Sequence, residues 1–253
     1  MTRVLAGKVD MREGALFPTR EDVHGIKRLA VLREAAASFN HKGYHATSLA
    51  EIAESLGVTK AALYHYFPNK NGVLRACFDH AMAACFASLE RGRKEGRNGR
   101  EKLILTLRLY LHQLIDELNC CVVLMEEQAL EPEDRLKLVK ERDRFERSLR
   151  ALVKEGIGDG SIVPCDPKLV IFSILGSLNW VSKWFKPGGA WEPDQLVEAL
   201  TQTFERTLSS SPVAALALSV GDLPTRASSA SAVPRYERPE AQSRKKPERA
   251  SRR

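Results

Sequence analysis

The stretch from Thr47 to Lys70, TSLAEIAESLGVTKAALYHYFPNK, constrains the fold more than any other part of the chain. Apolar residues recur at three- and four-residue steps up to Leu56, which predicts a helix with one buried face. Either Thr47 or Ser48 is placed to cap its first turn, and a glutamate three residues after Ser48 gives the spacing of a capping box. Gly57 then ends the helix, since glycine enters the left-handed region at little cost.

A second short helix is expected from Lys60 to Phe67, with Thr59 as its cap and Pro68 ending it. Val58 is expected to pack into the core just before this helix. Its opposite face carries small and polar side chains, which suits a close approach to a nucleic-acid groove. The residues of this face are Lys60, Ala61, Tyr64 and His65. A helix-turn-helix that binds DNA is one interpretation, and a plain amphipathic pair in an all-helical core is the other.

This part of the chain resembles the DNA-binding domain of TetR-family transcriptional regulators. The resemblance covers residues 31–74 and begins with VLREAAASF (31–39). The shorter matches are Gly43-Tyr44, Thr47-Ser48, Ile52-Ala53, Gly57-Val58-Thr59, Leu63-Tyr64-His65-Tyr66-Phe67 and Lys70. After Lys70 the family usually has an acidic residue, whereas this chain has Asn71, which we expect to alter only the cap of the next helix.

The resemblance implies an all-α fold with a three-helix head that binds DNA and a helical body for ligand binding and dimerisation. Tyr64 and Lys70 are expected to hold DNA phosphates. The residues expected at DNA are Thr47, Ser48, Thr59, Lys60, Ala61, Ala62, Tyr64, His65, Tyr66 and Lys70. The expected partners are a near-palindromic double-stranded operator, a second copy of the chain as a homodimer, and a small-molecule effector.

The chain divides into four expected parts. Residues 1–22 lack an apolar period and are expected to be a flexible arm, and residues 23–70 form the DNA-binding head. Residues 71–208 hold the helical body, and residues 209–253 are rich in Ser, Ala, Pro and Arg, which predicts disorder. The net charge of +7 is concentrated in this tail, because residues 226–253 hold nine Lys and Arg against three Glu. DNA binding then depends on local basic patches of a nearly neutral folded part.

Apolar periodicity predicts further helices. Their expected ranges are 23–41, 70–91, 103–118, 132–156, 168–185 and 194–208. Ile26 is expected on the inner side of the first helix, and the run RGRKEGRNGRE (91–101), with its three glycines, is expected to be a loop. Helix 168–185 is apolar nearly all round, so it should be buried on several sides. In the resembled family the last two helices pair with their copies as a four-helix bundle.

One cluster in the body is typical of a small-molecule site. Trp180 and Trp184 lie four apart on one helix with Asn179 and Lys183, and Arg144 and Arg147 come from the preceding helix. Two indoles supply flat apolar walls, and a guanidinium can hold a phosphate or carboxylate with two hydrogen bonds. The same pattern also fits tryptophans that pack in a core or dimer interface, with solvated arginines. The segment LNWVSKWFKPGG resembles a TetR subgroup that responds to acyl-CoA thioesters, which makes such a thioester the favoured effector.

The sequence shows no GxSxG, P-loop, GxGxxG or HExxH motif, so an enzyme, a cofactor and a metal site are not expected. Five cysteines without a CxxC pair indicate a reduced, cytoplasmic protein, and the apolar runs are too short to span a membrane. The prediction is a ligand-responsive dimeric repressor, and the alternative is a ligand-independent DNA-organising or partner-docking protein. An apolar cavity reaching Trp184 would favour the repressor, and a solid body would favour the alternative.

Overall fold

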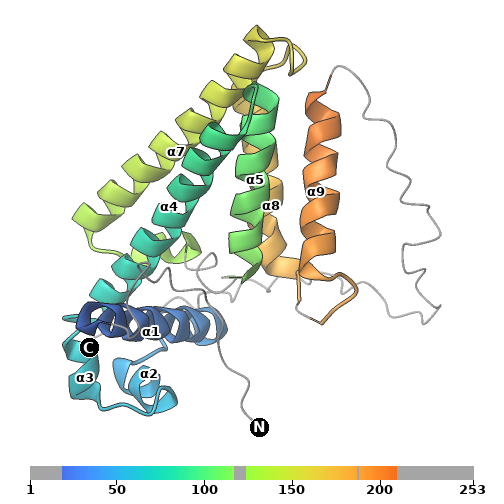
Figure 1. Cartoon of the computed structure of the whole chain (residues 1–253). Helices are drawn as coiled ribbons and strands as arrows, with labels where there is room; N and C mark the ends of the chain where they lie inside the picture. Colours follow the sequence, from blue (N-terminus) through green and yellow to red (C-terminus); the bar gives the residue numbers. More distant parts are fainter. Residues whose placement is uncertain (1–18, 117–123, 187, 210–253) are drawn as a thin grey trace, which may run out of the picture. The chain divides into compact units, whose positions relative to one another are not determined.

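The computed structural model describes residues 19–116, 124–186 and 188–209, which form eight α-helices, one 3₁₀ helix and no strand (Figure 1). The predicted all-α fold is therefore confirmed. The helices are α1 (Arg20–Lys42), α2 (Leu49–Ser55), α3 (Lys60–Tyr64), α4 (Lys70–Glu95), α5 (Gly99–Asp116), η1 (Leu124–Ala129), α7 (Pro132–Gly158), α8 (Pro167–Trp184) and α9 (Pro193–Leu208). Most of the expected arm and nearly all of the expected tail lie outside the described residues.

Helix α1 begins three residues before the predicted start. Thr19 and Asp22 form a capping box, in which the Asp22 N–H donates to the Thr19 hydroxyl at 3.1 Å. The helix ends at Gly43, whose φ of 81° suits a residue without a Cβ. Its buried side is Val31, Leu32, Ala35, Ala36 and Phe39. The prediction for Ile26 is wrong, because it lies one turn before this side and its side chain is 43% exposed.

Helices α2 and α3 follow the predicted pattern of caps, with two corrections. Ser48 and Glu51 form a capping box at the start of α2, and Gly57 takes a φ of 65° in the turn. The Thr59 hydroxyl caps α3 by accepting from the Ala62 N–H at 3.2 Å. Helix α3 is shorter than predicted and ends at Tyr64. The prediction that Val58 packs into the core is wrong, since it is 44% exposed.

The loop predicted at 91–101 is present between α4 and α5, but it is shorter than predicted and covers only residues 96–98. Helix α4 continues to Glu95, and α5 begins at Gly99. The glycines serve close packing instead of flexibility: a Cβ on Gly92 would lie 2.1 Å from the Thr106 hydroxyl oxygen. A Cβ on Gly99 would lie 2.1 Å from the backbone nitrogen of Gly156 on α7. Glycine therefore lets the ends of α4, α5 and α7 meet backbone to backbone.

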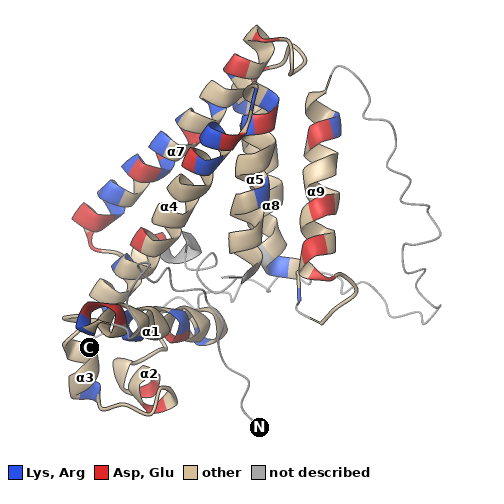
Figure 2. Ribbon diagram, viewed as in Figure 1, with Lys and Arg blue, Asp and Glu red and all other residues tan. Residues whose placement is uncertain are grey.

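The body is organised around α5, which contacts α4, α7, α8 and α9 (Figure 1). Charged residues alternate in sign along α7, whereas α5 and α8 are mostly uncharged (Figure 2). The buried side of α8 is Ile171, Ile174, Leu178 and Val181. Its other side is exposed in the single chain, so the prediction of burial on several sides does not hold within one copy. No helix among the described residues is long and apolar enough to cross a membrane.

Candidate DNA-binding head and effector cavity

The exposed face of α3 carries the residues that the sequence placed there. Lys60, Ala61, Tyr64 and His65 are exposed, and Ala62 is half-buried. The Lys60 ammonium lies 5.8 Å from the centre of the Tyr64 ring. This face combines two small residues with a cation and a phenol, so its backbone can approach a groove while longer side chains reach phosphates.

Two of the residues expected at DNA have contacts that hold the head together. Thr47 is only 2% exposed, and its hydroxyl donates to the carbonyl of Gly43 at 2.9 Å. The Tyr66 side chain is half-buried, and its ring lies 4.6 Å from the ring of His24 on α1. Thr47 thus fixes the turn before α2, and Tyr66 fixes the end of α3 against α1. Ser48 remains exposed, with its hydroxyl used in the cap.

Lys70 also has partners inside the protein. Its ammonium donates to the carbonyls of Tyr44 at 2.8 Å, Thr47 at 2.9 Å and His45 at 3.4 Å. It also lies 4.3 Å from the centre of the Tyr44 ring. An ammonium has three N–H donors, and these three carbonyls take them all. The structure therefore gives Lys70 a positioning role in the turn between α1 and α2, and its expected phosphate contact stays a prediction.

The first turns of α4 are tied to the segment that precedes and opens α7. The Asn71 side-chain nitrogen donates to the Ala129 carbonyl at 2.7 Å. One turn later, Arg75 donates to the Asp134 carbonyl at 2.8 Å. The helix cap is Asn69, whose side-chain oxygen accepts from the Gly72 N–H at 2.7 Å. The expectation that Asn71 alters only the cap is therefore wrong, because Asn71 bonds to a different element.

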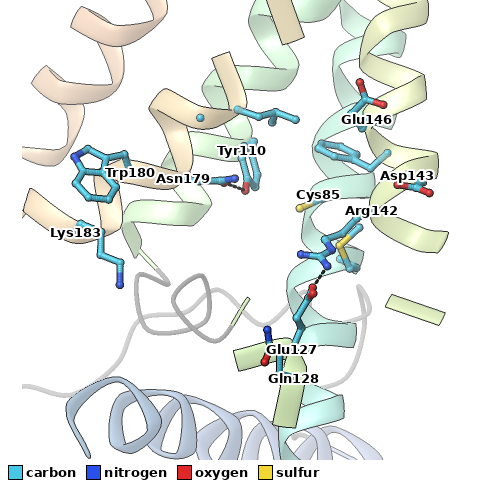
Figure 3. Close-up of a pocket in the computed structure, with 14 residues that line it drawn as sticks. Cys85, Tyr110, Glu127, Gln128, Arg142, Asp143, Glu146, Asn179, Trp180 and Lys183 are labelled. Carbon is cyan, nitrogen blue, oxygen red and sulfur yellow. Dashed lines mark hydrogen bonds and ion pairs between the residues drawn. The ribbon is translucent and has the colours of Figure 1, made fainter. Parts of the chain in front are cut away.

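A cavity of about 610 Å³ lies in the body between α4, α5, η1, α7 and α8 (Figure 3). Its lining residues are Met82, Cys85, Tyr110, Glu127, Gln128, Arg142, Asp143, Phe145, Glu146, Leu175, Gly176, Asn179, Trp180 and Lys183. Figure 3 shows Asn179, Trp180 and Lys183 on the α8 side, and Arg142, Asp143 and Glu146 on the α7 side. The volume falls within the range of small-molecule pockets.

Some polar groups of the cavity lining are paired within the protein, and one carboxylate oxygen is not. Glu127 forms an ion pair with Arg142 (Figure 3), and burial lowers the pKa of that guanidinium below its ordinary value. One carboxylate oxygen of Glu146 accepts from Arg150 at 2.5 Å, and the other is buried without a hydrogen-bond partner among the described residues. Burial also raises the pKa of the Cys85 thiol to about 12, so this thiol stays neutral.

The predicted ligand-binding cluster is only partly brought together. Asn179 and Trp180 line the cavity, whereas Trp184 does not. The Arg144 guanidinium lies 4.1 Å from the centre of the Phe86 ring, and Arg147 lines a second groove between α7 and the start of α8. Lys183 of the same cluster also lines the cavity. The sequence analysis missed the other charged cavity residues, which are Glu127, Arg142, Asp143 and Glu146.

A periodicity signal for two of them was present in the sequence. Arg142 lies four residues after buried Leu138 and three before buried Phe145, so helical spacing places it on the inner stripe of α7. Glu146 lies three residues before buried Leu149 and belongs to the edge of the same stripe. A charged residue inside the apolar stripe of a helix is a better indicator of an internal cavity than a charged residue outside the stripe.

The fold and the two sites define a class: a helix-turn-helix regulator with a small-molecule cavity in its helical body. Residues 31–77 match the family model for bacterial regulatory proteins of the tetR family, and residues 96–208 match that for the tetracyclin repressor-like C-terminal domain. The crystal structure of the TetR-family regulator PfmR from Thermus thermophilus is 33% identical, covers 71% of this chain and 98% of its own, and has a TM-score of 0.64.

The chain therefore belongs to the TetR family of transcriptional regulators, and it is a DNA-binding protein and not an enzyme. The repressor KstR2 of Mycolicibacterium smegmatis is 26% identical over 174 residues, which are 67% of this chain and 84% of KstR2. AibR, whose crystal structure contains isovaleryl coenzyme A and operator DNA, is 29% identical with a TM-score of 0.61, and the match covers 70% of this chain and 97% of AibR.

Proposed function

We propose that the protein is a homodimeric transcriptional repressor that binds a near-palindromic operator and leaves it when a small effector enters the cavity. The observation that carries this proposal is the position of α4, which connects both sites. Its residues Met82 and Cys85 line the cavity, and its first residue, Lys70, holds the turn between α1 and α2. An effector that favours one position of α4 thereby changes the affinity of the head for DNA.

In the operator complex, α3 lies in the major groove, with Ala61 and Ala62 nearest the bases. Lys60 and Tyr64 then reach phosphates, which position the head but do not read sequence. Two heads of one dimer occupy half-sites about one helical turn apart, because HTH dimers bind successive major grooves on one side of DNA. The exposure of these side chains and the family membership support this arrangement.

The dimer is formed by α8 and α9. Four large apolar side chains of α8 are exposed in the single chain, with Leu169 67% and Trp180 63% exposed. The other two are Phe172 and Trp184. Small residues lie between them, and an added Cβ on Gly176 would meet nothing within 4 Å. A helix face of this kind is typical of an interface between copies, because soluble single chains rarely expose such a contiguous apolar surface.

The favoured effector is an acyl-CoA thioester, an elongated and mostly apolar molecule with an anionic end. Phe145, Leu175 and Trp180 supply the apolar wall of the cavity. Three carboxylates line the α7 and η1 sides, so an anionic end is expected near Lys183 on α8. AibR supports this class of effector, since its crystal structure contains both isovaleryl coenzyme A and operator DNA.

The test is a titration of operator-bound protein with a panel of acyl-CoA thioesters and the corresponding free acids, followed by fluorescence anisotropy of labelled DNA. Trp180→Ala should weaken the response to the active thioester roughly tenfold or more, because a bound effector covers an indole that is 63% exposed in the single chain. Trp184→Ala is the matched control, since Trp184 lies outside the cavity lining. Release by none of the compounds would remove the acyl-CoA proposal and favour the ligand-independent alternative.

A further inference from the structure

Asn71 joins the DNA-binding head to one side of the cavity. An asparagine amide has two N–H donors, and one of these goes to the Ala129 carbonyl at 2.7 Å. Ala129 directly follows Glu127 and Gln128, which both line the cavity. We call residues 127–129 the cavity floor (Figure 3). Its position is set on the far side by the ion pair between Glu127 and Arg142, with a second, longer ion pair from Glu127 to Arg135 at 3.7 Å.

Asn71 follows Lys70, the first residue of α4, whose ammonium donates to the Tyr44 carbonyl in the turn between α1 and α2. Burial raises the pKa of the Tyr44 phenol above its ordinary value, and the Asn71 side chain opposes that rise. The bond from Asn71 to Ala129 therefore ties the helical turn that holds Lys70 to the cavity floor.

Tyr44 in turn fixes the turn that leads into α2. Its ring is 8% exposed, lies 5.3 Å from the ring of Phe39, and is covered by the Lys70 ammonium. The same ammonium donates to the carbonyls of Tyr44 and Thr47. A displacement of Tyr44 therefore shifts the chain just before the cap of α2, and α2 carries the short turn to α3.

We propose that Asn71 is a positioning residue that transmits the position of the cavity floor to the Tyr44–Thr47 turn and so to the DNA-reading helices. An aspartate at this position has nearly the same shape but no N–H donor, so it loses the bond to Ala129 and places a negative charge against that carbonyl oxygen. This inference deepens the proposed effector response, and it is testable without any effector, because Arg142→Gln breaks the floor ion pair directly.

The experiment is a double-mutant cycle on operator affinity, measured by anisotropy with a DNA duplex selected from a random library by the wild-type protein. Arg142→Gln is made in the wild-type, Asn71→Asp and Asn69→Asp backgrounds. Asn69→Asp is the matched control, because it makes the same chemical change two residues away. Asn69 acts through its side-chain oxygen, and aspartate keeps that acceptor.

Arg142→Gln should change operator affinity about fivefold in the wild-type and Asn69→Asp backgrounds, the size of one net hydrogen bond. In Asn71→Asp it should change affinity less than twofold, because the connection is already broken. An equal effect of Arg142→Gln in all three backgrounds would overturn the proposal, and so would the absence of any effect in the wild type.

Amide hydrogen exchange of the folded proteins provides a second readout that does not depend on DNA. Asn71→Asp should speed exchange in both the floor segment and the Tyr44–Thr47 turn, whereas Asn69→Asp should speed it in neither. Should Asn71→Asp fail to fold, Asn71→Ser removes the bridge without adding charge. Unchanged exchange in both segments would contradict the proposal. If no compound of the acyl-CoA panel releases the operator, this proposal still stands, because neither of its experiments uses an effector.

Discussion

Replacing Lys70 distinguishes the positioning role seen in the structure from the phosphate contact that the sequence suggested. Lys70→Ala removes two strong charge-assisted hydrogen bonds, to Tyr44 at 2.8 Å and Thr47 at 2.9 Å, and a weaker one at 3.4 Å. Hydrogen bonds from charged groups contribute about 1.5–3 kcal/mol each when buried, and the partial exposure of Lys70 reduces this value. Together with the contact to the Tyr44 ring, the expected loss is about 3 kcal/mol.

Such a loss should lower the melting temperature by roughly 10 °C, as followed by circular dichroism. Lys70→Met is the matched control for the aliphatic stem, and it should lose nearly as much because it also lacks the donors. The salt dependence of operator affinity separates the two roles. A lost phosphate contact reduces the slope of log affinity against log salt by about one unit, whereas the structure predicts an unchanged slope. A reduced slope with an unchanged melting temperature would refute the positioning role.

Three further outcomes are expected. Gly176→Arg should give monomers in sedimentation velocity, whereas Gly176→Ala should remain dimeric. The Gly176→Arg monomers should melt within a few degrees of the wild-type protein, because a Cβ at this position meets nothing within 4 Å in one copy. Gly99→Ala should lower the free energy of unfolding, measured with urea, by about 1–3 kcal/mol, because its Cβ would lie 2.1 Å from the Gly156 nitrogen. An unchanged free energy of unfolding would show that α5 and α7 separate freely. Tyr64→Phe should weaken binding to operator and random DNA alike, and a changed base preference would contradict its assignment to phosphate.

The parts of the fold that the sequence predicted depend on interactions between near neighbours. The Ser48–Glu51 box, the positive φ of Gly57 and the Thr59 cap each involve residues no more than three apart. Their geometry is therefore almost fully determined by residue type and spacing. The family membership likewise follows from this local motif, and the helices of the body follow from their apolar periods.

The failed predictions depend on which other element packs against a residue. Gly92 and Gly99 look like loop residues when read singly, yet each sits where a neighbouring helix backbone leaves no room for a Cβ. Val58 is apolar, but the turn that Gly57 sets leaves it facing outward. The DNA contact of Lys70 stays a prediction, but only the fold shows that three carbonyls converge on its ammonium. Periodicity describes a helix face, not what covers it.

The effector site shows the same limit for charge. Arg144 and Arg147 were predicted from their residue type and their place on the helix before the tryptophan pair, whereas the cavity lining contains Arg142, two residues away from Arg144 and on another face of α7. Helical geometry makes a shift of two residues a rotation of about 200° around the axis. A site argument on a helix therefore requires the rotational position of each residue as well as its type.

Helix α8 links the effector cavity to the proposed dimer interface. Gly176 and Trp180 line the cavity, and they lie on the α8 face that carries Phe172, which the single chain leaves exposed. If a second copy covers this face, it also covers part of the cavity entrance, so effector binding and dimerisation become linked equilibria. Linkage is reciprocal: an effector that binds the dimer more tightly than the monomer strengthens dimerisation by the same factor. Under the proposed function, an effector that strengthens dimerisation releases DNA by changing the spacing of the two heads of an intact dimer, so added effector should produce no monomer.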